Sequence, residues 1–181
     1  GPGTGLGVGG LVYSSRGWSP LSTEGGHASL AATNAREWAV VENLTERFGR
    51  VSQERVLSGP GLVNLYQALC QIDGVSPNEV TPGEIVQRSG EDPLSTETVR
   101  MFSGWLGCMS GDLAVTLGAL GGVYIGGGVL PRMGDKFDRE YFVERFLHKG
   151  RYRDYLKPVP VLLVINTEIA HLGLAALIQQ S

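Results

Sequence analysis

Glycines are concentrated at two places in the chain, and these clusters constrain the backbone more than any other feature of the sequence. The first spans Gly1–Gly7, with Pro2, Thr4 and Leu6 between its glycines, and the second is the run Gly126–Gly128. A glycine loop can turn through positive φ and present its N–H groups to an anion with no Cβ in the way. The two clusters therefore predict a nucleotide-binding cleft. Because a phosphate loop normally follows a strand of the core sheet, we also expect the chain to be the back part of a larger protein.

The composition is that of one ordinary soluble domain. With 181 residues, 42% of them hydrophobic, and a mean hydropathy of +0.01, the chain can bury a core of its own. Its formal net charge of −3 gives no electrostatic footprint for nucleic acid or for an acidic membrane surface. Cys70 and Cys108 show no CxxC spacing, which argues against a disulfide framework and a zinc site and favours a reducing cytoplasm. No apolar run approaches the roughly 18 residues of a membrane helix, and no leader opens the chain.

A group of cations near the C-terminus resembles a nucleic-acid patch at first sight. Acidic residues are interleaved with these cations, so a solvated helix face is the better interpretation. The cations are Arg145, His148, Lys149, Arg151, Arg153 and Lys157, and the acids are Glu140, Glu144 and Asp154. We therefore expect neither a nucleic acid nor a membrane as a partner.

The first half of the chain predicts a hairpin followed by helices. Leu6–Ser14 and the segment after Gly17 alternate as two strands of a β-hairpin. Asn34, with Glu37 three residues later, indicates a helix start of the capping-box type, and Gly49 ends that helix. The apolar positions of this helix recur at helical spacing, namely Trp38, Val41, Leu44 and Phe48. A second helix is predicted over 61–70, and a short one after Pro82.

The second half predicts one long helix and two strands. Residues 95–120 carry a stripe that steps by three or four and is expected to be buried: Val99, Phe102, Leu106, Met109, Leu113 and Leu117. The glycines within this helix indicate close packing against a sheet or a partner. Short strands are predicted at 123–125 and 160–165, and a closing helix at 168–180. Strands that alternate with helices make an α/β domain, with no linker that divides it.

Two common glycine motifs can be excluded. Gly5–Gly10 satisfies GxGxxG, but a dinucleotide motif needs a helix directly after it, and Leu11–Tyr13 continues as a strand. A Walker loop needs Gly-Lys-Ser or Gly-Lys-Thr, which the chain lacks. What remains is a hairpin-type phosphate loop, Gly3-Thr4-Gly5, in which the Thr4 hydroxyl and neighbouring N–H groups bond phosphate oxygens. A plain tight turn is the alternative.

A second group of polar residues could recognise a sugar. Glu24 and His27 flank two glycines, so they are expected to project from a tight loop rather than from a helix. A carboxylate beside an imidazole suits vicinal hydroxyls, although the two side chains could equally hold their own loop together. Glu54 precedes a Val-Leu-Ser-Gly-Pro-Gly segment and could simply be an acid near a helix start.

Taken in order, these blocks resemble the bacterial glucokinase family, of the hexokinase and actin-like ATPase superfamily. The blocks are Gly1–Gly7, Glu24-Gly25-Gly26-His27, Glu54–Leu62, Gly121–Arg132 and Lys149-Gly150-Arg151. The resemblance covers essentially the whole chain. It implies a ribonuclease-H-like (actin-like ATPase) α/β domain, with a mixed sheet and flanking helices.

The resemblance also implies roles for individual residues. The ATP-binding residues would be Gly3, Thr4 and Gly5 in the second phosphate loop, with Gly126, Gly127 and Gly128 bordering the adenosine. The glucose-binding residues would be Glu24, His27 and Glu54. The implied reaction is transfer of the ATP γ-phosphoryl group to the 6-hydroxyl of glucose, with Mg²⁺ bound to the nucleotide.

Two departures from the family pattern matter. The related sugar kinases that carry a structural zinc have a cysteine-rich block after their Glu-x-Gly-His, and none follows His27, so no metal site is expected in the chain. The family's first phosphate loop and the Asn-Asp pair that supplies the general base also have no counterpart in residues 1–181. The chain thus resembles the C-terminal large domain of a two-domain kinase. The N-terminal domain, as a partner, would supply the catalytic aspartate.

Two alternatives to the kinase remain open. Sugar-sensing repressors of the superfamily keep a sugar pocket but have no use for ATP. A domain that chiefly forms a homodimer could instead place the 95–120 stripe at its interface. For the kinase, a homodimer and domain closure around glucose and ATP are expected.

Overall fold

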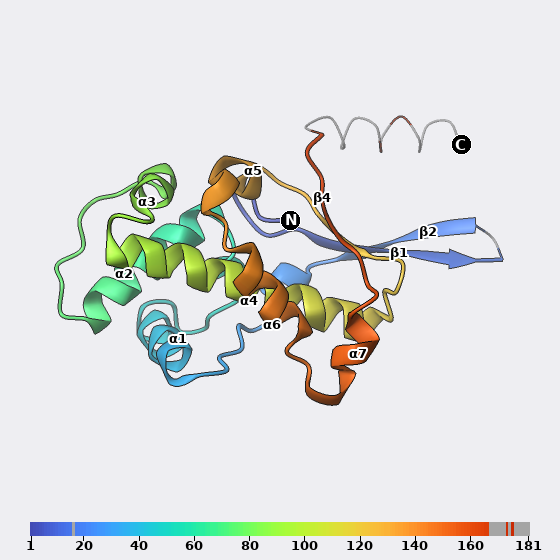
Figure 1. The fold of residues 1–181 in the computed structure, drawn as a ribbon, viewed down its shortest axis with the longest axis horizontal. Helices are drawn as coiled ribbons and strands as arrows, with labels where there is room; N and C mark the ends of the chain where they lie inside the picture. The colour runs from blue at the N-terminus through green and yellow to red at the C-terminus, as the bar shows by residue number, and fades with distance from the viewer. Residues whose placement is uncertain (16, 167–172, 174, 176–181) are drawn as a thin grey trace.

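The computed structural model describes residues 1–15, 17–166, 173 and 175, which form a helix-rich α/β fold (Figure 1). The strands are β1 (Val8–Ser14), β2 (Gly17–Thr23), β3 (Val123–Ile125) and β4 (Val161–Leu163). The α-helices are α1 (Ala35–Phe48), α2 (Gly59–Ile72), α3 (Pro82–Arg88), α4 (Pro93–Leu117), α5 (Val129–Met133), α6 (Arg139–Leu147) and α7 (Arg153–Leu156). Apart from residues 173 and 175, the predicted closing helix at 168–180 lies outside the described residues.

Helix α4 is the central element of the fold. It runs through the middle of the molecule, with α1, α2 and α3 around its first half and the β1–β2 hairpin projecting beyond its other end (Figure 1). Asp92 caps its start by accepting a hydrogen bond from Ser95 N–H (2.7 Å), and Gly118, with φ of 61°, ends it. Phe102 and Trp105 are buried, and Trp105 donates its indole N–H to Ala31 O (2.9 Å). Leu117, the last position of the predicted buried stripe, is 47% exposed, which corrects that part of the prediction.

The glycines of α4 allow another helix to lie directly on its backbone. A Cβ on Gly107 would stand 2.2 Å from Phe142 O, and one on Gly111 would stand 2.5 Å from Phe146 O. Both oxygens belong to α6. The predicted close packing is therefore real, but the neighbour is a helix of the same chain rather than a sheet or a partner.

Helix α1 buries Leu44 and packs Val41 and Phe48 against the core as predicted, and Trp38 is the one predicted position that faces outward. Asn34 caps it as predicted by accepting from Glu37 N–H (2.9 Å), and Gly49 ends it with φ of 72°. Trp38, however, is 61% exposed, whereas Glu37 is buried and forms an ion pair with Arg145 of α6. The charged Glu37 side chain therefore lies inside the fold, and the Trp38 indole faces solvent. The ion pair also shows that the solvated-face interpretation is wrong for Arg145.

The strands form two separate small sheets. β1 and β2 pair antiparallel from Val8–Thr23 to Ser14–Gly17, which confirms the predicted hairpin. β3 and β4 pair parallel, with Val123 opposite Val161. Among the described residues no pairing joins β1 to β3, so the single mixed sheet implied by the resemblance is not formed within this part of the chain. No helix in residues 1–15 and 17–166 is both long enough and apolar enough to cross a membrane.

Candidate functional site

The two glycine clusters, Gly1–Gly7 and Gly126–Gly128, are far apart in the sequence and meet in the fold. Val129 N–H donates to Pro2 O (3.3 Å). A Cβ on Gly127 would stand 2.3 Å from Pro2 O, and one on Gly1 would stand 2.1 Å from Gly126 O. Only bare backbone fits at this junction, so glycine is required on both sides of it.

The tip of the first loop is fixed from behind and open in front. Gly3 N–H donates to Gly5 O (2.8 Å), and Gly59 N–H, in the first turn of α2, donates to Gly3 O (2.8 Å). Thr4 is exposed. Within the described part of the chain, the N–H groups of Thr4 and Gly5 and the Thr4 hydroxyl have no hydrogen-bond partner. A rigid loop with several unpaired donors at its tip is suited to binding an anion.

Glu54 connects this loop to the body of the protein. It lies in the 3-10 turn Gln53–Arg55, is half-buried, and accepts a hydrogen bond from Leu6 N–H at Oε2 (2.7 Å). The turn itself is held by Ser58, whose hydroxyl donates to Glu54 O (2.9 Å). Glu54 is therefore more than an acid near a helix start, because its carboxylate fixes the backbone at the end of the phosphate-loop candidate.

The Glu-Gly-Gly-His segment lies against the same loop. A Cβ on Gly26 would stand 2.1 Å from Leu6 O, so this segment also approaches the loop as bare backbone. His27 N–H donates to Glu24 O (3.0 Å), which closes the 3-10 turn Gly25–His27. The side chains of Glu24 and His27 are exposed and, among the described residues, make no side-chain hydrogen bond. Backbone bonds, not these side chains, hold the loop together.

The turns that carry the three polar residues are neighbours. Gln53 N–H donates to Ala28 O (2.9 Å), which joins the turn of Glu54 to the turn of His27. Both turns contact Leu6, through Glu54 on one side and Gly26 on the other. The fold therefore gathers all nine predicted site residues around the loop Gly1–Gly7.

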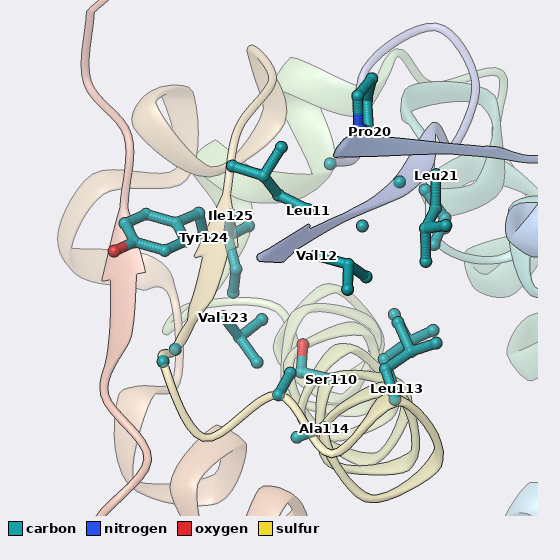
Figure 2. A pocket seen from close by; sticks show the side chains of 18 of the residues that line it. Leu11, Val12, Pro20, Leu21, Ser110, Leu113, Ala114, Val123, Tyr124 and Ile125 are labelled. Carbon is teal, nitrogen blue, oxygen red and sulfur yellow. The ribbon is translucent and has the colours of Figure 1, made fainter. Parts of the chain in front are cut away.

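A large cavity lies beside this group and not within it. It has a volume of about 900 Å³ and is mostly apolar, and it lies between β1, β3 and the second half of α4 (Figure 2). None of the nine predicted site residues lines it, although Gly1, Leu6 and Gly7 do. In the described residues, no group of three or more His, Cys, Asp and Glu side chains could hold a metal ion.

Two contacts at the site were not predicted. Gly59 supports the phosphate-loop candidate from behind, and its place in a Ser-Gly-Pro-Gly helix start was the only signal available. The Arg132 guanidinium lies beside Gly128, 3.5 Å from where a Cβ of that glycine would stand. Arg132 lies in the block Gly121–Arg132, so the sequence places it near the second glycine cluster. Nothing in the sequence indicates that its guanidinium folds back onto Gly128.

Comparison with known proteins identifies the family. The family model described as glucokinase matches residues 1–181. The chain belongs to the glucokinase family. A curated glucokinase from Hahella chejuensis is 48% identical over 177 residues, which is 97% of this chain and 55% of that relative. The chain thus spans about half the length of the curated relatives it matches.

Solved glucokinase structures share the fold. A crystal structure of a glucokinase from an Antarctic psychrotroph is 40% identical, with a TM-score of 0.91, and the match covers 99% of this chain and 56% of that one. A ROK family glucokinase from Streptomyces griseus, solved with glucose and AMPPNP, is 20% identical, with a TM-score of 0.62 over 99% of this chain and 59% of that one. The second likeness concerns the fold alone.

Proposed function

We propose that this chain forms part of a glucokinase that transfers the γ-phosphoryl group of ATP to the 6-hydroxyl of glucose. The observation that carries the proposal is the junction of the two glycine clusters, with unpaired donors at the exposed tip of the first. A kinase of this type acts mainly by positioning its substrates and stabilising charge, and oriented backbone donors provide both. Family membership over the whole chain supports the same activity.

On the nucleotide side, Gly3, Thr4 and Gly5 would hold phosphate oxygens. The free N–H groups of Thr4 and Gly5 and the Thr4 hydroxyl fit an anion, and the contact with Gly59 keeps the tip in place. Gly126–Gly128 would border the adenosine, as the sequence resemblance implies. Mg²⁺ would arrive with the nucleotide and neutralise phosphate charge. Because a sugar sensor has no use for phosphate donors, this loop favours the kinase over a sensor.

On the sugar side, Glu24, His27 and Glu54 would bond glucose hydroxyls. Glu24 and His27 are exposed and their side chains are not used within the described fold, so they are available to a ligand. Glu54 has one carboxylate oxygen occupied by Leu6 N–H, which leaves Oε1 to face a hydroxyl. The aspartate that takes the hydroxyl proton would come from the N-terminal domain of the enzyme. The cytoplasmic location and the homodimer stay predictions.

Kinetics of the full-length kinase would test the two roles separately. In Thr4→Val the hydroxyl is lost, and we expect the KM for ATP to rise about tenfold or more, the usual effect of a hydrogen bond to a charged group, while the KM for glucose changes little. Thr4→Ser keeps the hydroxyl and should behave like the wild type.

His27→Ala should weaken the binding of glucose about ten- to a hundredfold and change the binding of ATP far less. Equal losses for both substrates in either variant would contradict these assignments.

A further inference from the structure

Cys108 lies in a group of reactive side chains that the proposed function does not use. It belongs to α4, and Lys149 approaches it from the segment between α6 and α7, two helices that lie against α4 (Figure 1). The Lys149 Nζ donates to Cys108 Sγ (3.3 Å) and is paired with Asp112 Oδ1 (2.9 Å). The Cys108 thiol lies 3.7 Å from Asp112 Oδ2. A thiol and a primary amine are thus in direct contact, and the Lys149 side chain is largely buried rather than part of a solvated helix face.

A small cavity beside Cys108 has room for one further oxygen atom. Its volume is about 10 Å³, close to the smallest space that holds a water-sized group. Gln53 and Asp112 line it together with Cys108. The Gln53 Oε1 is buried and, in the part of the chain that the structure describes, has no hydrogen-bond partner. A hydroxyl group on the Cys108 sulfur would supply the donor that this acceptor lacks.

The other cysteine of the chain, Cys70, has different surroundings. It is fully buried in the core, and this burial raises the pKa of its thiol. The thiolate is the form that attacks peroxide, so Cys70 is expected to be inert. Cys108 has an ammonium group against its sulfur, which is the environment in which oxidation-sensitive cysteines occur. The two cysteines therefore differ in the feature that decides reactivity, although both are buried.

We propose that Cys108 and Lys149 form a peroxide-oxidised site that closes as a sulfur–nitrogen cross-link. In the first step the Cys108 sulfur attacks hydrogen peroxide, so that an S–O bond forms and the O–O bond breaks. The departing hydroxide takes the thiol proton and leaves as water. The sulfur is oxidised by two electrons, and the peroxide is reduced. The sulfenic acid that results has its hydroxyl in the small cavity, where it donates to Gln53 Oε1.

The second step joins α4 to the segment between α6 and α7. The Lys149 ammonium first loses a proton to solvent, and Asp112, which is half exposed, lies on that path. The amine nitrogen then attacks the Cys108 sulfur, so that an S–N bond forms and the S–O bond breaks. The hydroxide leaves as water with a second proton from the nitrogen. Sulfenic acids condense with nitrogen in this way, and the step needs no further oxidant.

The cross-link is reversible and independent of phosphoryl transfer. An added thiol attacks the S–N bond and releases the Lys149 amine, and a second thiol then frees Cys108 and leaves the reductant as a disulfide. Neither residue belongs to the candidate glucose or ATP site. The proposal would therefore hold for a protein without kinase activity, and a failure of the proposed function would not affect it.

Peptide mass spectrometry of the full-length kinase tests the site. After treatment with hydrogen peroxide we expect a joined pair of peptides that contain Cys108 and Lys149, with the mass of the two separate peptides less two hydrogens. Dithiothreitol should remove this species, and Cys70 should stay unmodified. The cross-link closes a loop across 41 positions, so it should raise the midpoint of thermal unfolding by about 5 °C or more.

Variants of two lysines separate this chemistry from general oxidation. Lys149→Arg keeps a cation beside Asp112 but has no primary amine, so oxidation should stop at a sulfenic acid that dimedone labels at Cys108, with no rise in the unfolding midpoint. Lys157→Arg is the matched control, because Lys157 is also paired with a carboxylate, that of Asp154 (2.6 Å), and should cross-link as the wild type does.

Three results would overturn the proposal. The first is equal modification of Cys70 and Cys108 by peroxide in the folded protein. The second is the same rise in the unfolding midpoint for Lys149→Arg as for the wild type, since that variant has no amine to join. The third is a Cys108 that stays unmodified at peroxide concentrations that oxidise a free cysteine in solution.

Discussion

At the scale of single residues, two neighbouring glycines of the candidate site, Gly126 and Gly127, have opposite surroundings. Gly127 has φ of 96°, and its Cβ would stand 2.3 Å from Pro2 O, whereas no heavy atom lies within 4 Å of a Cβ on Gly126. We expect Gly127→Ala to lower the free energy of unfolding by about 1–3 kcal/mol, because both the conformation and the contact are strained. Gly126→Ala should change it by less than about 0.5 kcal/mol. Urea unfolding of the two variants compares them directly, and similar losses would mean that the clusters do not pack as described.

A second residue-scale prediction separates Glu54 from His27. Glu54→Ala removes the acceptor of Leu6 N–H in a half-buried position, so we expect a loss of about 1–3 kcal/mol in unfolding free energy. His27→Ala removes an exposed imidazole with no side-chain bond in the described fold and should cost less than about 0.5 kcal/mol. Thermal unfolding measures both. If the two variants were equally stable, Glu54 would not fix the loop.

The conformation of the first glycine loop could be predicted from the sequence better than the contacts that hold it. The spacing of glycines around Thr4 predicted a loop with free donors, because glycine has a local conformational meaning. The bond from Leu6 to Glu54 was not predicted, since it joins residues 48 positions apart and depends on how two turns pack. The same applies to Gly26, whose role is to let Leu6 O approach. Local chemistry can be deduced from sequence, whereas such long-range contacts need the fold.

At the scale of elements, the contact between α4 and α6 depends on missing side chains. Gly107→Ala should lower the free energy of unfolding by about 1–3 kcal/mol, because the new methyl would overlap Phe142 O in a packed interface. Gly83→Ala in α3 is the matched control. It is also a helical glycine, but its Cβ would meet nothing closer than 4.0 Å, so the change should stabilise the protein by up to about 1 kcal/mol. Opposite signs in chemical unfolding are the expected result, and a neutral Gly107→Ala would contradict it.

Helices were predicted more accurately than the faces they bury. Three helices begin with a side-chain N-cap, namely Asn34, Ser58 and Asp92. An N-cap is a local feature that can be found in the sequence, because it depends on one residue type at the helix start. The burial of Glu37 in α1 was not predictable in this way, because it depends on the ion pair with Arg145, 108 positions away. Both small sheets were predicted as strands, but the partners of their open edges could not be deduced from the residues of the strands themselves.

The whole molecule gives the last prediction. Phosphoryl transfer requires the donor and the acceptor in line, with the reacting atoms about 3–3.5 Å apart and water excluded. The candidate residues Thr4, Glu24 and His27 are all exposed in the described fold, so the site has a floor but is open to solvent. The resemblance places the general base outside the chain, on a domain that would close over this surface.

We therefore expect purified residues 1–181 to show no glucose-dependent consumption of ATP above a buffer blank, while the full-length kinase turns over. Co-expression with the remaining part of the enzyme is the positive control, because it can supply both the base and the second wall of the site. Turnover by residues 1–181 alone that disappears in Glu24→Gln would show that the base lies within this chain. In that case the carboxylate at the sugar side, and not an aspartate from another domain, would take the proton from the hydroxyl.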